Sequence, residues 1–444
     1  MIVQNEMYSI DQRKMKQGIE KKQIYFDGKT PIPVSLTPFL IDKCKYDHLV
    51  SKSELVLEAM ETFLRIYIEY EDIQKHFPEL SVFRELSKVK PEYKYWIHLA
   101  RFDVTETIDG SFKLMETNCD CPGAILWVSY IKQIYEDLDI FKEISSKYEI
   151  NAQATDDPRL FIKSLIDVYK EVTGKNQDPN IGFLSSEYHP VLTDLDLLEK
   201  LAASMGLSAK HIPIQKLQSV ENLPGWDNKP LQMAFHKFDA FIDENDQFKY
   251  CLYEESVSEV EEYWNGLKNN QFIYVNSFPS AMVAENKRIL YLLKDKHIQS
   301  FFSEKQKEAI DMLIPETFSL TSQKLDQVKE VINNKDQYVL KRVIDTRGRG
   351  VILGKFCPAD LWSKHVNQAI DKPFIIQKYI DQSKKIIINP NVDPTQISVY
   401  QSLALYLIKG KASGLLCRSS IDPITNVGKR GAVQPAYIIS EREI

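Results

Sequence analysis

The sequence predicts a mixed α/β protein (α/β or α+β) with several sheets, and three observations support this prediction. Residues 180–186 (NIGFLSS) read as a buried strand, residues 192–205 as a helix ending before Gly206, and residues 211–217 (HIPIQKL) as a second strand. Such a strand–helix–strand unit is typical of an open α/β layer. An Asp-Gly turn lies between two alternating runs at 95–118, and strand and helix patterns alternate to the end of the chain.

The earlier part of the chain is predicted from its prolines and its apolar spacing. The first fifty residues read as extended, because Pro31, Pro33 and Pro38 interrupt any helical pattern there. Residues 49–77 and 122–150 read as helices.

The later part is predicted in the same way. Residues 285–296 and 303–312 have helical patterns. Strands are expected at 272–275, 338–343, 351–355, 374–380 and 400–409.

Length and charge restrict the class of protein. The chain has 444 residues, which suggests about three structural units. Lys and Arg number 56 against 62 Asp and Glu, so no broad basic field points to nucleic acid or an anionic membrane. No apolar run reaches the ~20 residues of a membrane span, and the first residues lack the apolar core of a signal peptide. Six cysteines are too few for a disulfide scaffold, so we expect reduced thiols in a cytoplasmic protein.

The hairpin at 95–118 gathers charged and polar side chains. A two-residue type I′ turn at Asp109-Gly110 would place Asp103 opposite Glu116 and Arg101 opposite Asn118. The same register pairs Ile108 with Ser111, Lys113 with Glu106, Met115 with Val104, and Thr117 with Phe102.

Directly opposed residues project to one side of a sheet, with Cβ atoms roughly 5 Å apart. Two opposed carboxylates repel each other unless a cation lies between them. Two carboxylates and an amide oxygen are ligands that suit Mg²⁺. The alternatives are a solvated face on which Arg101 neutralises the acids, and a one-residue register slip that would scatter the cluster.

A glycine-bearing loop follows the strand at 338–343. In TRGRG (346–350), glycines would let backbone N–H groups approach a phosphate, and two arginines add positive charge. The loop is not a P-loop, since no Gly-Lys-Ser/Thr follows. An ordinary glycine hairpin is the alternative. Lys341, on the preceding strand, could reach phosphates beneath the loop.

Other candidates are weaker taken singly. Lys287, at the start of the helix predicted over 285–296, could bind a second phosphate or could simply lie on the surface. The strand FIIQKYI (374–380) ends in a polar step at Gln377-Lys378, or is a plain core strand. His236, Lys237 and Asp239 could meet a substrate, although an exposed sheet edge is the alternative.

Taken together, six segments resemble the ATP-grasp ligases, and among them the glutathionylspermidine synthetase group, whose strand order is permuted. The segments are RFD (101–103), METNCDCPG (115–123), NSFPSAMVAENK (276–287), VLKRVIDTRGRG (339–350), IIQKYI (375–380) and CRSSIDPITN (417–426). In ordinary ATP-grasp enzymes the phosphate-binding lysines precede the metal-binding E-x-N. Here Glu116 to Asn118 comes first, as expected of the permuted group.

The resemblance implies an ATP-grasp fold with permuted strand order and a Rossmann-like α/β layer. It implies three regions: 1–150 with helices and the metal-binding hairpin, 151–275 as a Rossmann-like substrate-side domain, and 276–444 as the nucleotide-binding lobes with the glycine loop.

The resemblance also implies a role for each matching residue. Asp103, Glu116 and Asn118 would bind Mg²⁺, Arg101 would contact the transferring phosphoryl group, and Lys287 and Lys341 would bind ATP phosphates. The loop would close over those phosphates, and the backbone of a hinge segment would contact adenine. Arg418 and Asn426 would lie near an acyl phosphate. The loop residues are Thr346, Arg347, Gly348, Arg349 and Gly350, and the hinge residues are Gln377, Lys378, Tyr379 and Ile380.

The implied activity is that of an ATP-dependent carboxylate–amine ligase. It would form an amide or peptide bond through an acyl phosphate and release ADP and phosphate. The expected substrates are a small carboxylate and an amine, such as an amino acid, a peptide or a polyamine. Three alternatives remain open: loading of an amino acid onto the thiol of a separate carrier protein, nucleotide binding without ligase turnover, and nucleotidyl transfer with release of AMP.

Cys119 and Cys121 fit no part of the resemblance, and a single C-x-C pair makes a poor metal site.

Overall fold

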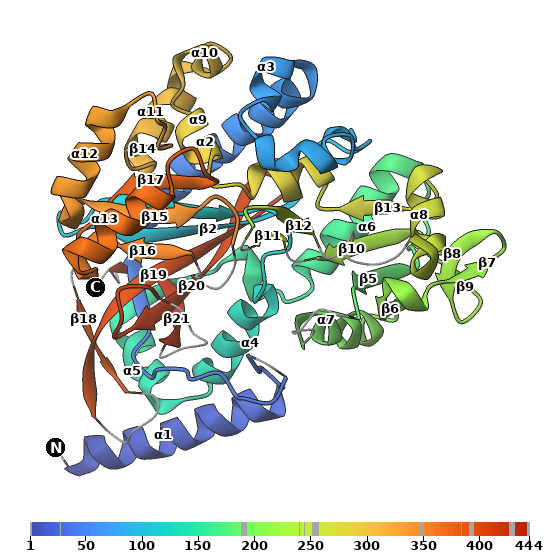
Figure 1. Cartoon of the computed structure of the whole chain (residues 1–444). Helices are drawn as coiled ribbons and strands as arrows, with labels where there is room; N and C mark the ends of the chain where they lie inside the picture. Colours follow the sequence, from blue (N-terminus) through green and yellow to red (C-terminus); the bar gives the residue numbers. More distant parts are fainter. Residues whose placement is uncertain are drawn as a thin grey trace.

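The computed structural model of the chain describes most of the 444 residues. It describes no structure at residues 1, 27, 188–192, 239, 244, 251–256, 346, 347, 349, 383, 390–394, 426–430 and 442–444, and no side chains at 2–6 and 257. The described residues form a mixed α/β protein, as predicted. A large mixed sheet lies in the middle of the molecule. A parallel sheet lies to one side of it and a small antiparallel sheet to the other (Figure 1). No helix within the described part of the chain is long and apolar enough to cross a membrane.

The large sheet draws its eight strands from both ends of the chain. Six strands run in the order β1-β21-β20-β19-β2-β3, β18 pairs with β19, and β4 pairs with β21. The predicted strand at 400–409 is therefore part of a longer one. The strands are β1 (Phe39–Asp42), β2 (Leu99–Glu106), β3 (Phe112–Asn118), β4 (Tyr148–Asn151), β18 (Lys385–Ile388), β19 (Gln396–Ile408), β20 (Lys411–Ser420) and β21 (Gly431–Glu441).

The two faces of this sheet have different roles. Along β19, Leu403, Leu405 and Leu407 pack into the hydrophobic core that contains α2 (Lys43–Glu69). The alternate residues, including Ala404 and Tyr406, belong to the core that contains α4 (Ile125–Glu136). Asp103 pairs with Ala404 and Arg101 with Tyr406, so the polar side chains of β2 share the α4 face. The period-two alternation of a strand thus separates the buried core from a site on the opposite face.

The β2–β3 hairpin corrects one part of the predicted register. Arg101 pairs with Asn118, Phe102 with Thr117 and Asp103 with Glu116, as predicted. Beyond a bulge between Asp103 and Val104 the pairing shifts by one, so the pairs predicted for Lys113 and Met115 are wrong. The observed outer pairs are Val104 with Leu114, Thr105 with Lys113, and Glu106 with Phe112.

The turn explains the shift. Gly110 has φ +82° and its N–H donates to the oxygen of Thr107, while the N–H of Thr107 donates to the oxygen of Ser111. This is a three-residue loop, with a left-handed residue only at Gly110, and not the predicted type I′ turn. The longer loop and the bulge displace the register in opposite directions. The inner pairs consequently return to the predicted alignment.

The second sheet is the predicted parallel layer. Its order is β13-β10-β5-β6, and all three pairings are parallel. The strands are β5 (Ile181–Ser185), β6 (Ala209–Pro213), β10 (Met233–Lys237) and β13 (Ile273–Val275). The helices of this part are α6 (Leu160–Thr173), α7 (Thr193–Ser204) and α8 (Glu261–Lys268), placed around the sheet on the right of Figure 1. β10 lies between β5 and β13, so Lys237 does not lie on a sheet edge.

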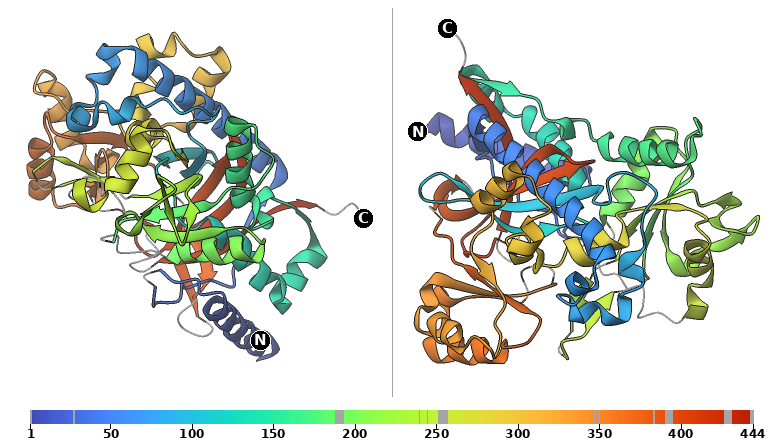
Figure 2. Two further views of the ribbon diagram at one scale, coloured as in Figure 1. Left: turned by 90° about the vertical axis from the view of Figure 1, so that its right-hand side faces the viewer. Right: turned by 90° about the horizontal axis from the view of Figure 1, so that it is seen from above.

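The third sheet is antiparallel, in the order β14-β17-β15-β16. Helices α12 and α13 pack on it through a separate small core that includes Trp362 and Leu340. Seen from above, this lobe and the parallel sheet lie apart at opposite sides of the molecule (Figure 2). The elements are β14 (Thr317–Phe318), α12 (Leu325–Asn333), β15 (Tyr338–Arg342), β16 (Val351–Leu353), α13 (Ala359–Gln368) and β17 (Phe374–Lys378).

The remaining elements show where helix prediction was wrong. The first fifty residues are not extended throughout, because α1 (Ile2–Lys21) is a 20-residue helix and α2 starts at Lys43. The predicted helix 285–296 is broken: a π-helical turn, η7 (Ser280–Ala284), precedes the short α9 (Ile289–Leu292). The predicted helix 122–150 divides into α4, α5 (Asp139–Lys147) and β4. Further elements are α3 (Glu71–Gln74), α10 (Lys296–Gln299), α11 (Glu304–Leu313), β7 (Gln218–Val220), β8 (Leu223–Trp226), β9 (Lys229–Pro230), β11 (Ala240–Ile242) and β12 (Phe248–Tyr250).

Candidate functional site

One cavity lies where the three sheets approach one another. Its volume is about 360 Å³. The hairpin β2–β3 and strands β19 and β20 form one wall, and β15, β16 and the end of β17 form another. Residues from α7 and the end of β10 close the side toward the parallel sheet. Segments far apart in the sequence therefore share one space, as expected for a binding site between sheets.

Most of the predicted site residues lie in this cavity. Those that line it are Arg101, Asp103, Glu116, Asn118, Lys341, Gly348, Tyr379, Ile380 and Arg418.

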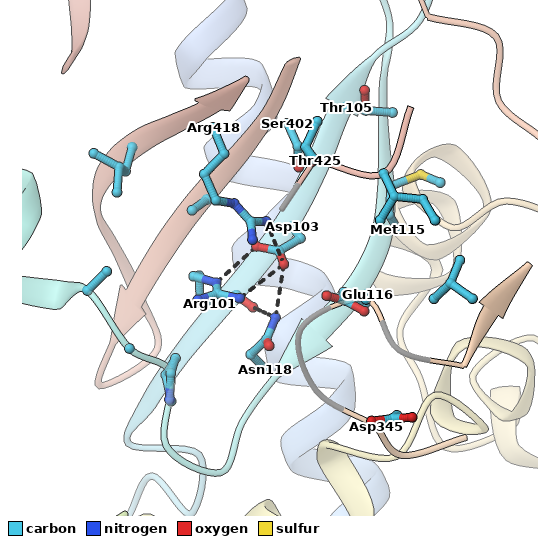
Figure 3. Close-up of a pocket in the computed structure, with 18 of the residues that line it drawn as sticks. Arg101, Asp103, Thr105, Met115, Glu116, Asn118, Asp345, Ser402, Arg418 and Thr425 are labelled. Atoms are coloured by element: carbon cyan, nitrogen blue, oxygen red, sulfur yellow. Dashed lines mark hydrogen bonds and ion pairs between the residues drawn. The ribbon is translucent and has the colours of Figure 1, made fainter. Parts of the chain in front are cut away.

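Asp103 is the centre of a charged cluster on the wall formed by β2 and its neighbours (Figure 3). The guanidinium group of Arg101 donates through Nε to Oδ1 at 2.9 Å and through a second nitrogen to Oδ2 at 3.1 Å. Arg418, from β20, approaches Oδ2 at 2.8 Å. Asn118 donates its amide N–H to Oδ2 at 3.3 Å. The three partners come from β2, β3 and β20, so the cluster joins residues more than 300 positions apart.

Burial and charge act in opposite directions on Asp103. Burial disfavours its ionised form, but the two arginines outweigh burial and hold the pKa of the carboxyl well below its usual range. The pKa of Arg101 is correspondingly raised by Asp103, against the effect of burial. Asp103 and Arg101 are therefore both ionised at neutral pH and present fixed charges to the cavity.

Glu116 and Lys287 meet beside this cluster. The Nζ atom of Lys287 lies 3.5 Å from Oε2 of Glu116 and donates to the backbone oxygen of Asp345 at 3.5 Å. The backbone N–H of Lys287 donates to the oxygen of Val343 at 2.8 Å, which attaches this segment to the end of β15. Lys287 is buried and is not on a helix, contrary to the predicted surface-helix alternative.

Lys341 reaches the same region from beneath. Its Nζ donates to the backbone oxygen of Met115 at 2.9 Å and to the side-chain oxygen of Gln377 at 2.6 Å. Burial lowers the pKa of Lys341 to about 8, while the charge of Glu116 opposes that change. A buried amine next to Met115 places one positive charge directly under the bulge of β3.

The glycine loop is described only in part. Gly348 lines the cavity, and both Gly348 and Gly350 have positive φ, at +69° and +67°. A Cβ at Gly350 would lie 2.9 Å from the side chain of Arg342, so the turn needs glycine there for space as well as for conformation. The predicted loop residues Thr346, Arg347 and Arg349 lie outside the described residues, as does Asn426.

The side chains of the four predicted hinge residues lie in different places, and the backbone contact with adenine stays a prediction. Tyr379 and Ile380 line the cavity, but Gln377 is fully buried and bonds Lys341. Lys378 donates to Gln337 at 2.9 Å and lies over the ring of Tyr338, away from the cavity. Alternation places Gln377 and Lys378 on opposite faces of β17, and Tyr379 and Ile380 follow the end of that strand.

Three lining residues, Glu285, Tyr406 and Asp194, were not predicted from the sequence, whereas Lys237 was named there as a possible substrate contact. Glu285 accepts the backbone N–H groups of Cys119 and Asp120, the latter at 3.0 Å, and fixes the chain just after Asn118. Burial raises the pKa of Glu285 to about 7, although Lys287 lowers it. Tyr406, Asp194 and Lys237 also line the cavity. Glu285 lies in the same segment as the predicted Lys287, so that motif could have pointed to it. Asp194 and Tyr406 lie in ordinary helix and strand patterns that do not distinguish them as site residues.

Several other candidates are structural. His98 is buried against Ser164 at 2.9 Å, and burial lowers its pKa to about 3. His236 stacks on Tyr274 inside an aromatic cluster. Cys119 is buried, and the described residues contain no group of three or more His, Cys, Asp or Glu side chains that could hold a metal ion. Asp239 lies outside the described residues.

The residues predicted for Mg²⁺ offer oxygen donors, and their role as metal ligands stays a prediction. An ionised carboxylate offers about four acceptor positions. Three of the four contacts on Asp103 fall on Oδ2 and one on Oδ1, which leaves acceptor capacity on Oδ1. Asn118 uses its N–H₂ toward Asp103, and Glu116 is half-buried at the edge of the cavity. Oxygen donors of this kind fit a hard divalent cation.

Comparisons with known proteins give only distant structural likenesses. No family model and no curated protein matches the chain. D-alanyl-alanine synthetase A from Vibrio cholerae is 11% identical with a TM-score of 0.31, over 55% of this chain and 68% of that one. A RimK domain ATP-grasp protein from Sphaerobacter thermophilus is 12% identical with a TM-score of 0.28, over 54% of this chain and 91% of that one. The ATP-grasp ligase PsnB, in complex with a minimal precursor, is 10% identical with a TM-score of 0.28, over 60% of this chain and 92% of that one. The function proposed next therefore depends on this chain's own residues.

Proposed function

We propose that this protein is an ATP-dependent carboxylate–amine ligase of the permuted ATP-grasp type, acting through an acyl phosphate with release of ADP and phosphate. The observation that carries the proposal is the convergence of Asp103, Glu116 and Asn118 with Lys341 and Arg418 in one cavity. The motifs that contribute these residues are spread over 101–426. In this proposal region 1–150 supplies the hairpin, 151–275 the substrate side and 276–444 the nucleotide side.

The first step would be attack of a substrate carboxylate oxygen on the γ-phosphorus of ATP. The bond between that phosphorus and the ADP oxygen breaks as the acyl phosphate forms. Such a step needs alignment and charge neutralisation more than a protein nucleophile. Lys287 and Lys341 would hold phosphates from beneath, and Arg101 and Arg418 would balance charge on the transferring group. Mg²⁺, held by Asp103, Glu116 and Asn118, would supply further charge neutralisation when bound.

In the second step the amine nitrogen would attack the acyl carbon. The nitrogen–carbon bond forms, the carbon–oxygen bond to phosphate breaks, and the nitrogen loses one proton as phosphate leaves. The protein's own contribution would be to keep water from the acyl phosphate, through the walls of the cavity and, as the resemblance implies, through the loop at 346–350.

The test is a turnover assay with ATP and Mg²⁺, pooled carboxylic acids, amino acids and polyamines, and chromatographic separation of ADP from AMP. ADP and phosphate that appear only when both an acid and an amine are present would support the proposal. AMP would indicate adenylation and contradict it. Tight ATP binding without turnover, even with a supplied carrier-protein thiol, would favour a nucleotide-binding protein instead.

A further inference from the structure

The side of the cavity toward the parallel sheet carries a pair of opposite charges. Lys237 is the last residue of β10, and Asp194 lies in the first turn of α7. The Nζ atom of Lys237 is 3.4 Å from Oδ2 of Asp194, and both residues line the cavity. The carboxyl ends of parallel strands are where α/β sheets bind ligands.

The segment that follows the metal-binding motif is fitted to this pair. Gly123 packs against it so closely that a Cβ there would lie 2.8 Å from Oδ2 of Asp194 and 3.6 Å from Nζ of Lys237. The N–H of the next residue, Ala124, donates to Oδ2 of Asp194 at 3.1 Å. The carboxylate of Asp194 is therefore fixed from two sides, by a backbone donor and by an ammonium group.

The pair lies next to the cluster around Asp103. Tyr406 donates its hydroxyl hydrogen to the oxygen of Gly123 at 2.8 Å, and in the sheet it pairs with Arg101. Burial raises the pKa of Tyr406 to about 12, so it stays a neutral hydrogen-bond donor between the two groups. A small molecule could therefore extend from one group to the other within the same cavity.

Another residue of the same cavity carries a polar atom without a hydrogen-bond partner in the described part of the chain. The indole N–H of Trp127, in the first turn of α4, is buried and donates to no acceptor among the described residues. Trp127 lines the cavity, and the residue as a whole is only 9% exposed. An unpaired buried donor costs free energy unless a ligand supplies an acceptor.

We propose that this end of the cavity, formed by Asp194, Lys237 and Trp127, binds a free amino acid. The ligand's carboxylate would lie against the Lys237 ammonium and the Trp127 N–H, and its amino group against the Asp194 carboxylate. The amino acid is then the acceptor amine of the ligation, a role that rests on the function proposed above. The cluster around Asp103 would hold the other substrate.

The charges of the wall discriminate between the candidate amines. A polyamine carries only positive charges, so Lys237 would repel it at the position that Asp194 makes favourable. A simple carboxylate would satisfy Lys237 but would be repelled by Asp194. Only a ligand that carries an ammonium and a carboxylate group on the same carbon atom is complementary to both Asp194 and Lys237.

A purely internal ion pair is the alternative, and two features disfavour it. Strong charge-assisted hydrogen bonds are about 2.7–2.9 Å long, whereas this contact is 3.4 Å. Both side chains also line a cavity instead of packing beneath it. Taking two charges out of water is costly, and that cost is better explained where a ligand uses them.

Calorimetric titration of the whole protein with the twenty amino acids in small pools, followed by the single binder, tests the proposal. Each binder is compared with its carboxamide, which keeps the amino group but loses the carboxylate. Wild-type protein should bind the amino acid at least tenfold more tightly than the carboxamide. In Lys237→Met that ratio should fall toward one. Lys216→Met, which removes an exposed lysine paired with Glu187 in the same part of the chain, should leave the ratio unchanged.

Lys237→Met removes the ammonium group that pairs with the Asp194 carboxylate, and this change alone could unfold the protein. A second variant therefore distinguishes loss of binding from loss of folding. The double variant Asp194→Asn/Lys237→Met removes both charges, and circular dichroism with thermal melting checks that each variant folds. The double variant should lose amino acid binding while keeping a normal melting curve. Wild-type protein that binds no amino acid, or that binds a diamine equally well, would overturn the proposal, as would an unchanged ratio in folded Lys237→Met. Because binding is measured without turnover, loss of ADP formation alone contradicts the ligase proposal and not this one.

Discussion

Lys341 and Gln377 form a buried hydrogen bond of 2.6 Å between β15 and β17. Gln377 in turn donates to the hydroxyl of Thr317 at 3.3 Å, so the amide is held at both ends. The glutamine thus supports the lysine that the proposed mechanism assigns to ATP phosphates. Its side chain does not line the cavity.

We expect Gln377→Leu to weaken ATP binding. The buried ammonium group would lose its side-chain acceptor, and a hydrogen bond to a charged group contributes about 1.5–3 kcal/mol. The KM for ATP should rise about tenfold or more, with a smaller fall in kcat. Gln377→Glu keeps an acceptor oxygen for Lys341 but cannot donate to Thr317, so it tests the acceptor separately from the donor. Equal KM values for wild type and Gln377→Leu would show that the contact does not position Lys341.

The second prediction concerns Glu116, which lies opposite Asp103 on the hairpin. We expect Glu116→Ala to lower nucleotide turnover by about a hundredfold or more, because it removes a carboxylate from the proposed metal site. The fold should survive, since the side chain is partly exposed. Circular dichroism and an ADP release assay measure the two effects.

Glu106 offers a matched control for Glu116. It lies at the other end of β2, where its carboxylate pairs with Lys45 at 3.1 Å outside the cavity. Glu106→Ala should therefore keep nearly full turnover. Full activity in Glu116→Ala would remove the basis for the metal assignment.

The hairpin shows how far sequence reasoning could succeed. The pairing of Asp103 with Glu116 and of Arg101 with Asn118 was predicted from Asp109-Gly110 and the alternation of residues. The turn type was wrong, and only the bulge near Met115 restored the inner register. A bulge depends on packing against neighbouring strands, and no local pattern in KLMETN announces it. The site residues were therefore found although part of the reasoning about the turn was incorrect.

Other parts of the fold and site depended on long-range contacts. Residues 2–21 form a helix, yet their apolar residues give little amphipathic pattern, so tertiary packing of Met15 and Ile19 decides the structure. The hydrogen bond from Lys341 to the side chain of Gln377 could not be predicted either, because it joins residues 36 positions apart on two strands. The approach of Asp194 to the Asp103 cluster could not be predicted, since it requires the relative position of two sheets.

The third prediction concerns Arg418. Its guanidinium group contacts Asp103 at 2.8 Å, and its buried Nε has no hydrogen-bond partner among the described residues. We expect Arg418→Met to lower kcat strongly, by about a hundredfold, because a positive charge near the transferring group is lost. Asp103 keeps its two bonds from Arg101, so the fold should remain.

Arg418→Lys separates charge from geometry. Lysine keeps the charge but cannot donate in the planar fork of a guanidinium. An intermediate kcat would indicate that both matter. Wild-type kcat in Arg418→Met would exclude Arg418 from the proposed chemistry.

The last prediction concerns stability and pH, and it is independent of the proposed function. Glu61, on α2, is buried, accepts the N–H of Ile97 at 2.7 Å and has one carboxyl oxygen without a hydrogen-bond partner among the described residues. Burial raises its pKa from 4.5 to about 7, although the Ile97 bond and Arg65 lower it. The folded protein therefore holds the Glu61 carboxyl proton more tightly than the unfolded chain does. The contribution of this protonation to stability is complete below pH 4.5 and is lost as the pH rises through 7.

Glu61→Gln keeps the acceptor for Ile97 but does not titrate. Between pH 4.5 and 7.5 the free energy of unfolding of wild type should fall by about 2–3 kcal/mol relative to Glu61→Gln, as measured by urea denaturation. A wild-type free energy of unfolding that stays constant or rises with pH, relative to that of Glu61→Gln, would show that Glu61 is already ionised in the folded protein.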